Sequence, residues 1–355
     1  MTGKKPMLLR PASKDYLWGG SRLNDDFNLG IDMYPLAEAW VCSTHPDGPS
    51  TVEGADETKV LAEGSGEDKT LANDKTLPDA RREDKSLADV LREDPSMLGS
   101  HVLQITEGKA ELPILIKLID AKSDLSVQVH PDDEYAKRVE GQWGKTEMWY
   151  VLSAKPGAQL VYGFNRDLEA EQVRKALAEK RLNECLNHVP VKKNDLFFIQ
   201  AGTVHAIGAG CLIAEIQQSS NVTYRLYDYD RVGKDGKLRP LHVDKALEVA
   251  NLKSSVSPRQ PMRVLKYVNG CAAELLSRCK YFQVERMLLN TEGRKLVDFR
   301  TGSNSFHALL CVDGCGVLFG EGYMQNFFKG DCIFVPANSM ELKLHGTAQI
   351  LDVSC

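Results

Sequence analysis

Short runs of apolar or alternating residues follow one another from about residue 112 onward. Each run ends at Gly, Pro or Asn, or at a polar turn such as residues 122–124. This patterning is typical of β-strands, because successive side chains of a strand point to opposite faces of its sheet. The strands predicted here are ILIKLIDA (114–121), LSVQVH (125–130), MWYVLSA (148–154), AQLVYGF (158–164), DLFFIQA (195–201) and CLIAEIQQ (211–218).

Three segments show helical spacing instead, with apolar residues three and four positions apart. The longest lies within residues 165–187, and Asn165 or Asp167 is its expected N-terminal cap. A shorter helix is predicted over residues 244–251. The third helix follows the cap residue Ser86, and its inward-facing residues are Leu87, Val90 and Leu91.

After Pro258 the chain returns to short strands separated by Gly and Asn turns. Evenly spaced short strands are typical of a β-sandwich or jelly roll. The sequence therefore predicts a mainly β protein with a β-rich unit carrying helical insertions (1–255) and a smaller all-β domain (256–355). Its predicted C-terminal strands include, as separate elements, FHALLCV (306–312), GVLFG (316–320), MELKLHG (340–346) and AQILDV (348–353).

The composition is that of a soluble globular protein, since 43% of the 355 residues are hydrophobic and 26% are charged. The 44 basic and 49 acidic residues leave a net charge of −5, which argues against a general nucleic-acid binder, because such proteins need an excess of positive charge. No apolar run approaches the roughly 18 residues of a membrane-spanning helix, and the N-terminus has no secretory signal pattern. Nine scattered cysteines without a CxxC pair favour reduced thiols and a cytoplasmic location.

The acidic excess is concentrated in residues 53–94, which carry 13 acidic and 7 basic residues. Three related hexads, EDKTLA, NDKTLP and EDKSLA, repeat within this segment. It contains no aromatic residue and few large aliphatic ones, so it cannot bury much surface. We expect its first part to be an exposed loop, with an acidic docking surface as the alternative.

Three polar stretches in or next to the predicted strands carry candidate metal ligands. Two histidines, a carboxylate and an amide together suit zinc or another divalent first-row metal. Each residue alone is more often structural, so the spacing leaves both interpretations open. The polar residues that share strand faces in these stretches are Ser126, Gln128 and His130, then Lys145 and Glu147, then His205.

A fourth stretch, residues 215–231, is dense in hydrogen-bonding and aromatic side chains. Its Arg225 is of the type that grips a phosphate or carboxylate through two parallel hydrogen bonds. A surface strand with Tyr and Arg packing across it is an equally good interpretation of this stretch alone.

Taken together and in this order, the four stretches are far more specific than any one of them alone. VQVHPDD, GKTEMWYVL, AGTVHAIG and EIQQSSNVTYRLYDYDR, in this order, closely resemble the type I mannose-6-phosphate isomerases, which are zinc-dependent enzymes of the cupin superfamily. LWGG (17–20) and AEAW (37–40), which leads to STHPDGPS, are also similar to this family. The resemblance is clear over most of residues 8–250 and only general in the C-terminal domain.

The resemblance implies two cupin-type jelly-roll β-barrels with one Zn²⁺ per chain. It implies that the chain interconverts mannose 6-phosphate and fructose 6-phosphate by proton transfer between carbons 1 and 2 through an enediol or enediolate. The resemblance further implies that the protein binds a small sugar phosphate and binds neither nucleic acid nor a membrane. It also implies a monomer or a weak homo-oligomer.

The family's functional residues match positions of this chain. The implied roles are zinc ligation by Gln128, His130, Glu147 and His205, catalysis by Arg225, phosphate-side binding by Ser126 and Lys145, and proton transfer by Glu215. The general base stays open between Glu215, Lys145 and a zinc-bound hydroxide.

Two features depart from the ligand-bearing pattern of the family. Gln200 replaces the proline that usually precedes AGTVHA, and we expect a looser turn before His205. In the C-terminal domain His307 and His345 stand isolated, which predicts a metal-free jelly roll.

Three other functions compete with this interpretation. Another metal-dependent cupin enzyme, such as an iron-dependent dioxygenase, would explain the histidines and Glu147, but not Ser126, Lys145 and Arg225 together. A non-catalytic sugar-phosphate-binding cupin would bind the substrate without isomerising it. An interaction protein recruited through the acidic repeats would not need the ligands.

Overall fold

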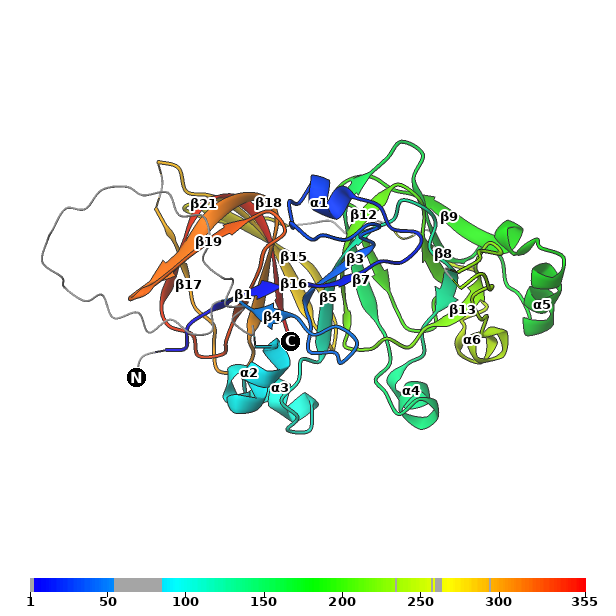
Figure 1. Cartoon of the computed structure of the whole chain (residues 1–355), viewed down its shortest axis with the longest axis horizontal. Coiled ribbons are helices and arrows are strands. Elements are labelled where there is room, and N and C mark those ends of the chain that lie inside the picture. Colours follow the sequence, from blue (N-terminus) through cyan, green and yellow to red (C-terminus); the bar gives the residue numbers. More distant parts are fainter. Residues whose placement is uncertain (1–2, 54–84, 234, 257, 259–263, 294) are drawn as a thin grey trace, which may run out of the picture.

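The computed structural model describes residues 3–53, 85–233, 235–256, 258, 264–293 and 295–355. Antiparallel strands in three sheets dominate these residues, so the prediction of a mainly β protein is confirmed. Figure 1 shows the sheets side by side, with the C-terminal sheet at one end of the molecule and helices α5 and α6 at the other.

The central sheet has six strands in the order β10-β7-β12-β5-β3-β2. Three of its strands, β5, β7 and β12, are predicted in the sequence as long apolar runs, and their pairing is antiparallel throughout. The strands are β2 (Ala12–Lys14), β3 (Glu38–Cys42), β5 (Ile114–Asp120), β7 (Glu147–Ala154), β10 (Leu196–Ile199) and β12 (Cys211–Gln218).

A five-stranded sheet lies against one face of the central sheet, in the order β13-β6-β11-β8-β9. Its strand β9 was not predicted, because it follows directly on a helical segment. The strands are β6 (Val127–Val129), β8 (Gln159–Phe164), β9 (Leu186–Pro190), β11 (His205–Ile207) and β13 (Tyr224–Tyr227).

The two N-terminal sheets enclose an apolar layer that includes Trp149 and Ile213 of the central sheet and Leu160 and Ile207 of the other. The opposite face of the central sheet packs into a second core that also contains C-terminal residues such as Phe306. The strands of the central sheet are therefore covered on both faces. This explains why β5 is apolar at nearly every position and is buried along its whole length.

The ten-stranded C-terminal sheet runs β14-β15-β16-β21-β18-β20-β1-β4, with β17 paired to β21 and β19 paired to β18. An apolar cluster that includes Leu309, Ile333 and Ile350 fills its interior. The strands are β1 (Met7–Arg10), β4 (Thr51–Val52), β14 (Lys266–Val268), β15 (Cys271–Arg278), β16 (Gln283–Asn290), β17 (Val297–Phe299), β18 (His307–Gly320), β19 (Tyr323–Phe328), β20 (Cys332–Val335) and β21 (Leu342–Ser354).

Two pairs of predicted C-terminal strands are each one long strand. FHALLCV and GVLFG join as β18, and MELKLHG and AQILDV join as β21. The glycines that suggested turns bend these strands without ending them. Gly314 (φ +75°) follows a bulge at Cys311/Asp313, and Gly346 (φ +137°) pairs with Gly316 across the ladder.

The third predicted helix is confirmed, because Ser86 caps α2 by accepting from the Asp89 backbone N–H. The prediction of Asn165 or Asp167 as a cap is wrong, since α5 starts later and Glu169 is its capping residue. Gln172 completes that cap by accepting from the Glu169 N–H at 2.7 Å. The helices are α1 (Arg22–Asp25), α2 (Leu87–Glu93), η1 (Pro95–Met97), α3 (Ser100–Ile105), α4 (Asp133–Val139), α5 (Ala170–Ala178), η2 (Leu182–Cys185) and α6 (Val243–Val249).

The N-terminal segment contributes to both ends of the molecule. Strand β1 pairs with β20, and β4 pairs with β1, so residues 7–10 and 51–52 belong to the C-terminal sheet. This differs from the predicted continuous unit over residues 1–255. Long-range strand pairing of this kind leaves no local signal in the sequence.

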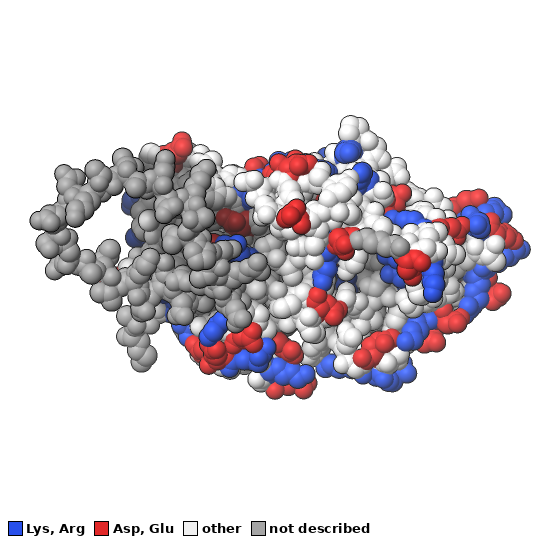
Figure 2. Space-filling view, in the orientation of Figure 1, with Lys and Arg blue, Asp and Glu red and all other residues white. Residues whose placement is uncertain are grey.

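The surface carries charges of both signs. Figure 2 shows Lys and Arg interspersed with Asp and Glu over the described part of the face in view. No helix of the described ranges has the length and apolarity needed to cross a bilayer. The first two acidic hexads (67–72 and 73–78) lie outside the described residues, whereas the third (83–88) is described from Lys85 onward and leads into α2.

Candidate metal centre

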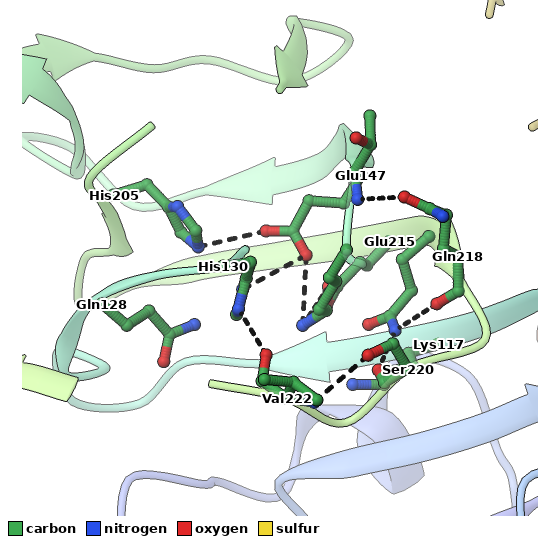
Figure 3. A network of polar contacts seen from close by, with 12 residues as sticks. Lys117, Gln128, His130, Glu147, His205, Glu215, Gln218, Ser220 and Val222 are labelled. Carbon is green, nitrogen blue, oxygen red and sulfur yellow. Dashed lines mark hydrogen bonds and ion pairs between the residues drawn. The ribbon is translucent and has the colours of Figure 1, made fainter. Parts of the chain in front are cut away.

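Three potential ligands from three strands meet between the two N-terminal sheets. His130 directly follows β6, His205 opens β11, and Glu147 opens β7 of the central sheet. Their ligand atoms all lie within 4.8 Å of one another, and each side chain is only 1% exposed. Figure 3 shows the Glu147 carboxylate pointing toward both imidazoles.

Backbone carbonyls orient both imidazole rings. His130 Nδ1 lies 2.8 Å from the carbonyl oxygen of Val222, and His205 Nδ1 lies 2.8 Å from that of Thr203. A carbonyl can only accept a hydrogen bond, so each Nδ1 carries the proton and each Nε2 carries a lone pair. A carbonyl that accepts from the other ring nitrogen commonly fixes the ring orientation of a metal-binding histidine.

The two Nε2 lone pairs face a carboxylate. His205 Nε2 lies 3.2 Å from Glu147 Oε1, and His130 Nε2 lies 3.7 Å from Glu147 Oε2. None of these four buried atoms has a hydrogen-bond partner among the described residues, although Lys145 Nζ forms an ion pair with Glu147 Oε2 at 3.2 Å. Burial, and next the charge of Lys145, hold the pKa of His130 well below its usual value, so a proton does not readily fill this space. Two imidazoles and one carboxylate are the donor set of many zinc sites, and these residues fit a divalent metal ion.

Gln128 and Arg225 form a row with His205 across three neighbouring strands. Gln128 of β6 pairs directly with His205 of β11 on one side and with Arg225 of β13 on the other. Directly paired residues share a face of the sheet, so all three side chains are on the side of the candidate metal centre. Figure 3 shows Gln128 beside the two histidines.

Ser126 connects the members of this row. Its hydroxyl donates to Gln128 Oε1 at 3.3 Å and accepts from Arg225 Nε at 3.3 Å. Arg225 also donates through Nη1 to the carbonyl oxygen of Pro240 at 3.0 Å. The guanidinium is therefore held at two points beside the candidate ligand Gln128.

A buried lysine and a second carboxylate lie next to the ligands. Lys145 Nζ is 3.2 Å from Glu147 Oε2 and 3.6 Å from Glu215 Oε1. Burial, and next the charge of Glu147, raise the pKa of Glu215 to about 8, although Lys117 and Lys145 oppose this shift. Burial opposes the charge of Glu147 itself, but Lys145 and the histidines outweigh it and hold its pKa well below the usual value. The site thus contains one carboxylate that stays ionised and one that can hold a proton near neutral pH.

Lys117 and Glu38 complete this buried charge cluster, and neither was identified in the sequence as a candidate site residue. Lys117 pairs with Glu215 across β5 and β12, and its Nζ lies 3.6 Å from Glu38 Oε2. Glu38 also accepts from Trp40 Nε1 at 2.7 Å. A lysine inside the apolar run ILIKLID was the available signal, because a fully buried lysine needs a specific partner.

The turn before His205 is closed despite the substitution by Gln200. The Thr203 backbone N–H donates to the carbonyl oxygen of Gln200 at 3.0 Å, and Gly202 N–H donates to that of His130 at 2.8 Å. Gly202 has φ +88°, which a glycine adopts without strain. The turn therefore fastens the two histidine-bearing segments to each other.

The C-terminal histidines are engaged in other contacts. His307 Nδ1 lies 2.7 Å from Asp352 Oδ1, and His345 Nδ1 lies 2.7 Å from Thr291 Oγ1. Among the described residues, neither histidine belongs to a group of three converging metal-ligating side chains.

Two family models match the chain. Residues 74–147 match the catalytic domain of type I phosphomannose isomerase, and residues 272–355 match the cupin domain of mannose-6-phosphate isomerase. The first match includes the candidate ligands His130 and Glu147.

Curated and solved relatives agree with these matches. The chain is 32% identical over 349 residues to the mannose-6-phosphate isomerase ManA of Bacillus subtilis, with 98% of each chain covered. A mannose-6-phosphate isomerase of Streptococcus mutans is 35% identical over 249 residues, which is 70% of this chain and 68% of that protein. The crystal structure of a Bacillus subtilis mannose 6-phosphate isomerase superposes with a TM-score of 0.80 at 29% identity, over 99% of this chain and 100% of that chain. A zinc-bound mannose 6-phosphate isomerase has the same fold, with a TM-score of 0.72 at 16% identity over 99% of each chain. This chain belongs to the type I mannose-6-phosphate isomerase family.

Proposed function

We propose that this chain is a zinc-dependent isomerase that interconverts mannose 6-phosphate and fructose 6-phosphate. The observation that carries the proposal is the convergence of His130, Glu147 and His205 on one buried point with their ligand atoms unsatisfied. Family membership supplies the substrate class, and Lys145, Glu215 and Arg225 supply groups of the kind that the reaction needs.

Zinc would be held by Gln128, His130, Glu147 and His205. When bound, it supplies Lewis acidity that offsets negative charge developing on a sugar oxygen. The Val222 and Thr203 carbonyls keep both imidazole Nε2 atoms directed at the ligand position. Because the rings are already oriented, little rearrangement accompanies binding.

Glu215 is the group that we assign to proton transfer between carbons 1 and 2. Such a group must accept a proton from one carbon and return it to the next, so both of its protonation states must be accessible. A pKa of about 8 meets this condition near neutral pH. Lys145, 3.6 Å from Glu215, is the alternative carrier.

Arg225, Ser126 and Lys145 are assigned to the anionic parts of the substrate. A guanidinium preorganised by Ser126 and Pro240 can stabilise an enediolate or bind a phosphate without first reorganising. Burial, and next the nearby Arg239, lower the pKa of Arg225, yet an arginine remains charged at physiological pH.

We assign the chemistry to the unit formed by residues 1–255, apart from β1 and β4, and a supporting role without metal to residues 256–355. The nine free cysteines are consistent with action in the reducing cytoplasm. We expect a monomer or a weak homo-oligomer.

A coupled spectrophotometric assay with mannose 6-phosphate, with and without a strong chelator, tests the function. We expect turnover that the chelator abolishes and that added zinc restores. Binding of the sugar phosphate without isomerisation would favour a non-catalytic cupin. Oxygen uptake in the presence of iron would favour a dioxygenase.

A further inference from the structure

The turn between β15 and β16 of the C-terminal sheet contacts the start of α4 in the N-terminal unit. The two donors on this turn meet one carboxylate oxygen. Tyr281 Oη donates to Asp133 Oδ2 at 2.8 Å, and Lys280 Nζ lies 3.3 Å from the same oxygen. Asp133 comes three residues after the candidate ligand His130 in the chain.

The second oxygen of the same carboxylate binds two segments of the N-terminal unit. Asp133 Oδ1 accepts from the Gly144 backbone N–H at 3.0 Å and from Gln218 Nε2 at 2.8 Å. One side chain therefore joins the C-terminal turn to two segments of the N-terminal unit. Its pKa is lowered, because these donors together outweigh the effect of burial.

Both of these segments adjoin Lys145 and Glu147: Gly144 directly precedes Lys145 in the chain, and Gln218 is hydrogen-bonded to Thr146, which lies between the two residues. Gln218 Oε1 accepts from the Thr146 backbone N–H at 2.8 Å, and the Gln218 N–H donates to the Thr146 carbonyl at 3.1 Å. Thr146 is thus held on both sides by one glutamine that Asp133 orients. Figure 3 shows Gln218 bonded to the backbone next to Glu147.

The backbone at Gly144 lies tightly against the same helix start. A Cβ atom at this position would come 2.5 Å from the Asp132 carbonyl carbon and the Asp133 nitrogen. Lys145 N–H donates to the Pro131 carbonyl at 3.0 Å, which closes the contact. The segment that carries Lys145 and Glu147 therefore follows the position of the Asp133 backbone.

The C-terminal turn is itself firmly anchored. Cys279 N–H donates to the Phe282 carbonyl at 3.0 Å, and the Phe282 ring is 1% exposed within the core shared by both units. Tyr281 packs against the same core. The tyrosine hydroxyl is consequently a fixed point to which Asp133 can be tied.

We propose that Asp133 and Tyr281 are positioning residues, through which the C-terminal sheet holds the Lys145–Glu147 segment in its metal-binding geometry. The proposal rests on the function proposed above. It gives the metal-free domain a defined part in the reaction, since loosening this link would displace a ligand and a lysine without removing either.

The test uses the zinc-loaded full-length enzyme and Tyr281→Phe, which removes only the hydroxyl. We expect zinc release to a chromogenic chelator to be about tenfold faster, in line with the effect of altered outer-shell contacts. We expect kcat to fall by about threefold to tenfold while KM changes by less than about twofold, since substrate contacts are intact. Asp133→Asn should give the same pattern, because its amide cannot accept from the donors at both ends.

Two lysine variants serve as matched controls. Lys343→Ala removes a surface ion pair with Asp298 at 2.6 Å in the C-terminal sheet and should change neither rate. Lys280→Ala should have a smaller effect than Tyr281→Phe, because the Lys280 side chain is 71% exposed and screened by water. All rates are measured well below the melting temperature of each variant.

Unchanged zinc release and unchanged kcat in both Tyr281→Phe and Asp133→Asn would overturn the proposal, even if both variants melt earlier. If the wild-type chain binds zinc but does not isomerise mannose 6-phosphate, the proposed function fails, and the release rates alone decide on the positioning role. A wild-type chain that binds no zinc would remove both proposals.

Discussion

The N-terminal sheet pair and the C-terminal sheet each contain a histidine beside a carboxylate, yet the two arrangements differ in which ring nitrogen meets the carboxylate. In the C-terminal sheet His307 Nδ1 meets Asp352 at 2.7 Å, and the pair is complete in itself. In the N-terminal unit each Nδ1 is occupied by a backbone carbonyl, and the Nε2 atoms of His130 and His205 converge on Glu147. A single histidine beside a carboxylate is therefore weak evidence for a metal site, whereas two imidazole lone pairs that converge on one buried carboxylate indicate a cation site.

The two regions also differ in their surrounding charges. Buried Lys117, Lys145, Glu38 and Glu215 surround the N-terminal cluster. Unpaired buried charges are costly, so a cluster of this kind is maintained only where its members satisfy one another. Near His307 the partner is Asp352, followed by the weaker influence of Glu285.

We expect the strongest effect from changing the carboxylate beside the histidines in each sheet. Glu147→Gln keeps the size of the side chain but removes its charge, so we expect loss of bound zinc and a fall in kcat of at least about 10³-fold. Asp352→Asn is the matched change in the other sheet and should leave both within about twofold, because distant sites act independently. Metal analysis after dialysis and a steady-state assay measure the two outcomes. Equal losses of bound zinc and of kcat in Glu147→Gln and Asp352→Asn would contradict the assignment of the metal site to the N-terminal unit.

The second strongest effect is expected from Arg225 of β13, the arginine beside the candidate ligand Gln128. We expect Arg225→Ala to lower kcat/KM by about 10²-fold, because a preorganised positive group is lost. A fall mainly in kcat would assign the guanidinium to the enediolate, and a rise mainly in KM would assign it to the phosphate. Arg300→Ala, which removes a surface ion pair with Glu341, is the control. Near-normal activity in Arg225→Ala would exclude a catalytic role.

A third prediction concerns the junction of the two units. Tyr150 Oη accepts from Arg286 Nη1 at 2.9 Å and from Gln349 Nε2 at 2.7 Å, and it donates to Asn194 at 2.7 Å. We expect Tyr150→Phe to lower the free energy of unfolding by about 1–3 kcal/mol, because three partly buried hydrogen bonds are lost together. Urea unfolding measures this loss. Tyr267→Phe on the exposed edge strand β14 is the control, and a similar value for both variants would show that this junction contributes little.

We expect the weakest effect from the pH dependence of the His307–Asp352 pair. Burial lowers the pKa of His307, but the adjacent Asp352 outweighs burial and raises it overall. The stabilisation by the protonated pair is therefore complete below the ordinary histidine pKa of about 6.5 and is lost as the pH rises through the raised value. At pH 6 we expect His307→Gln to be less stable than the wild type by on the order of 1 kcal/mol. This difference should shrink toward pH 9 in urea unfolding experiments, and a difference that grows with pH would reverse the sign assigned here.

Much of this protein is predictable from short stretches of sequence. The apolar runs ILIKLIDA and CLIAEIQQ predict β5 and β12, and Ser86 predicts the start of α2, because each pattern reflects contacts between near neighbours in the chain. The residue types at 128, 130, 147 and 205 suggest a metal site, since few other side chains serve as ligands.

The tertiary structure decides what these patterns become. Pairing of β1 and β4 with the C-terminal sheet, the approach of Lys117 to Glu38, and the bond from Tyr281 to Asp133 each join residues far apart in the sequence. Contacts of this kind depend on register and packing across the whole chain and leave no periodic signal. Local sequence is enough to show which chemical groups are available and which strands carry them. Only the packing of the two N-terminal sheets decided that three ligand atoms meet at one point, because convergence is a property of the assembled sheets and not of any single strand.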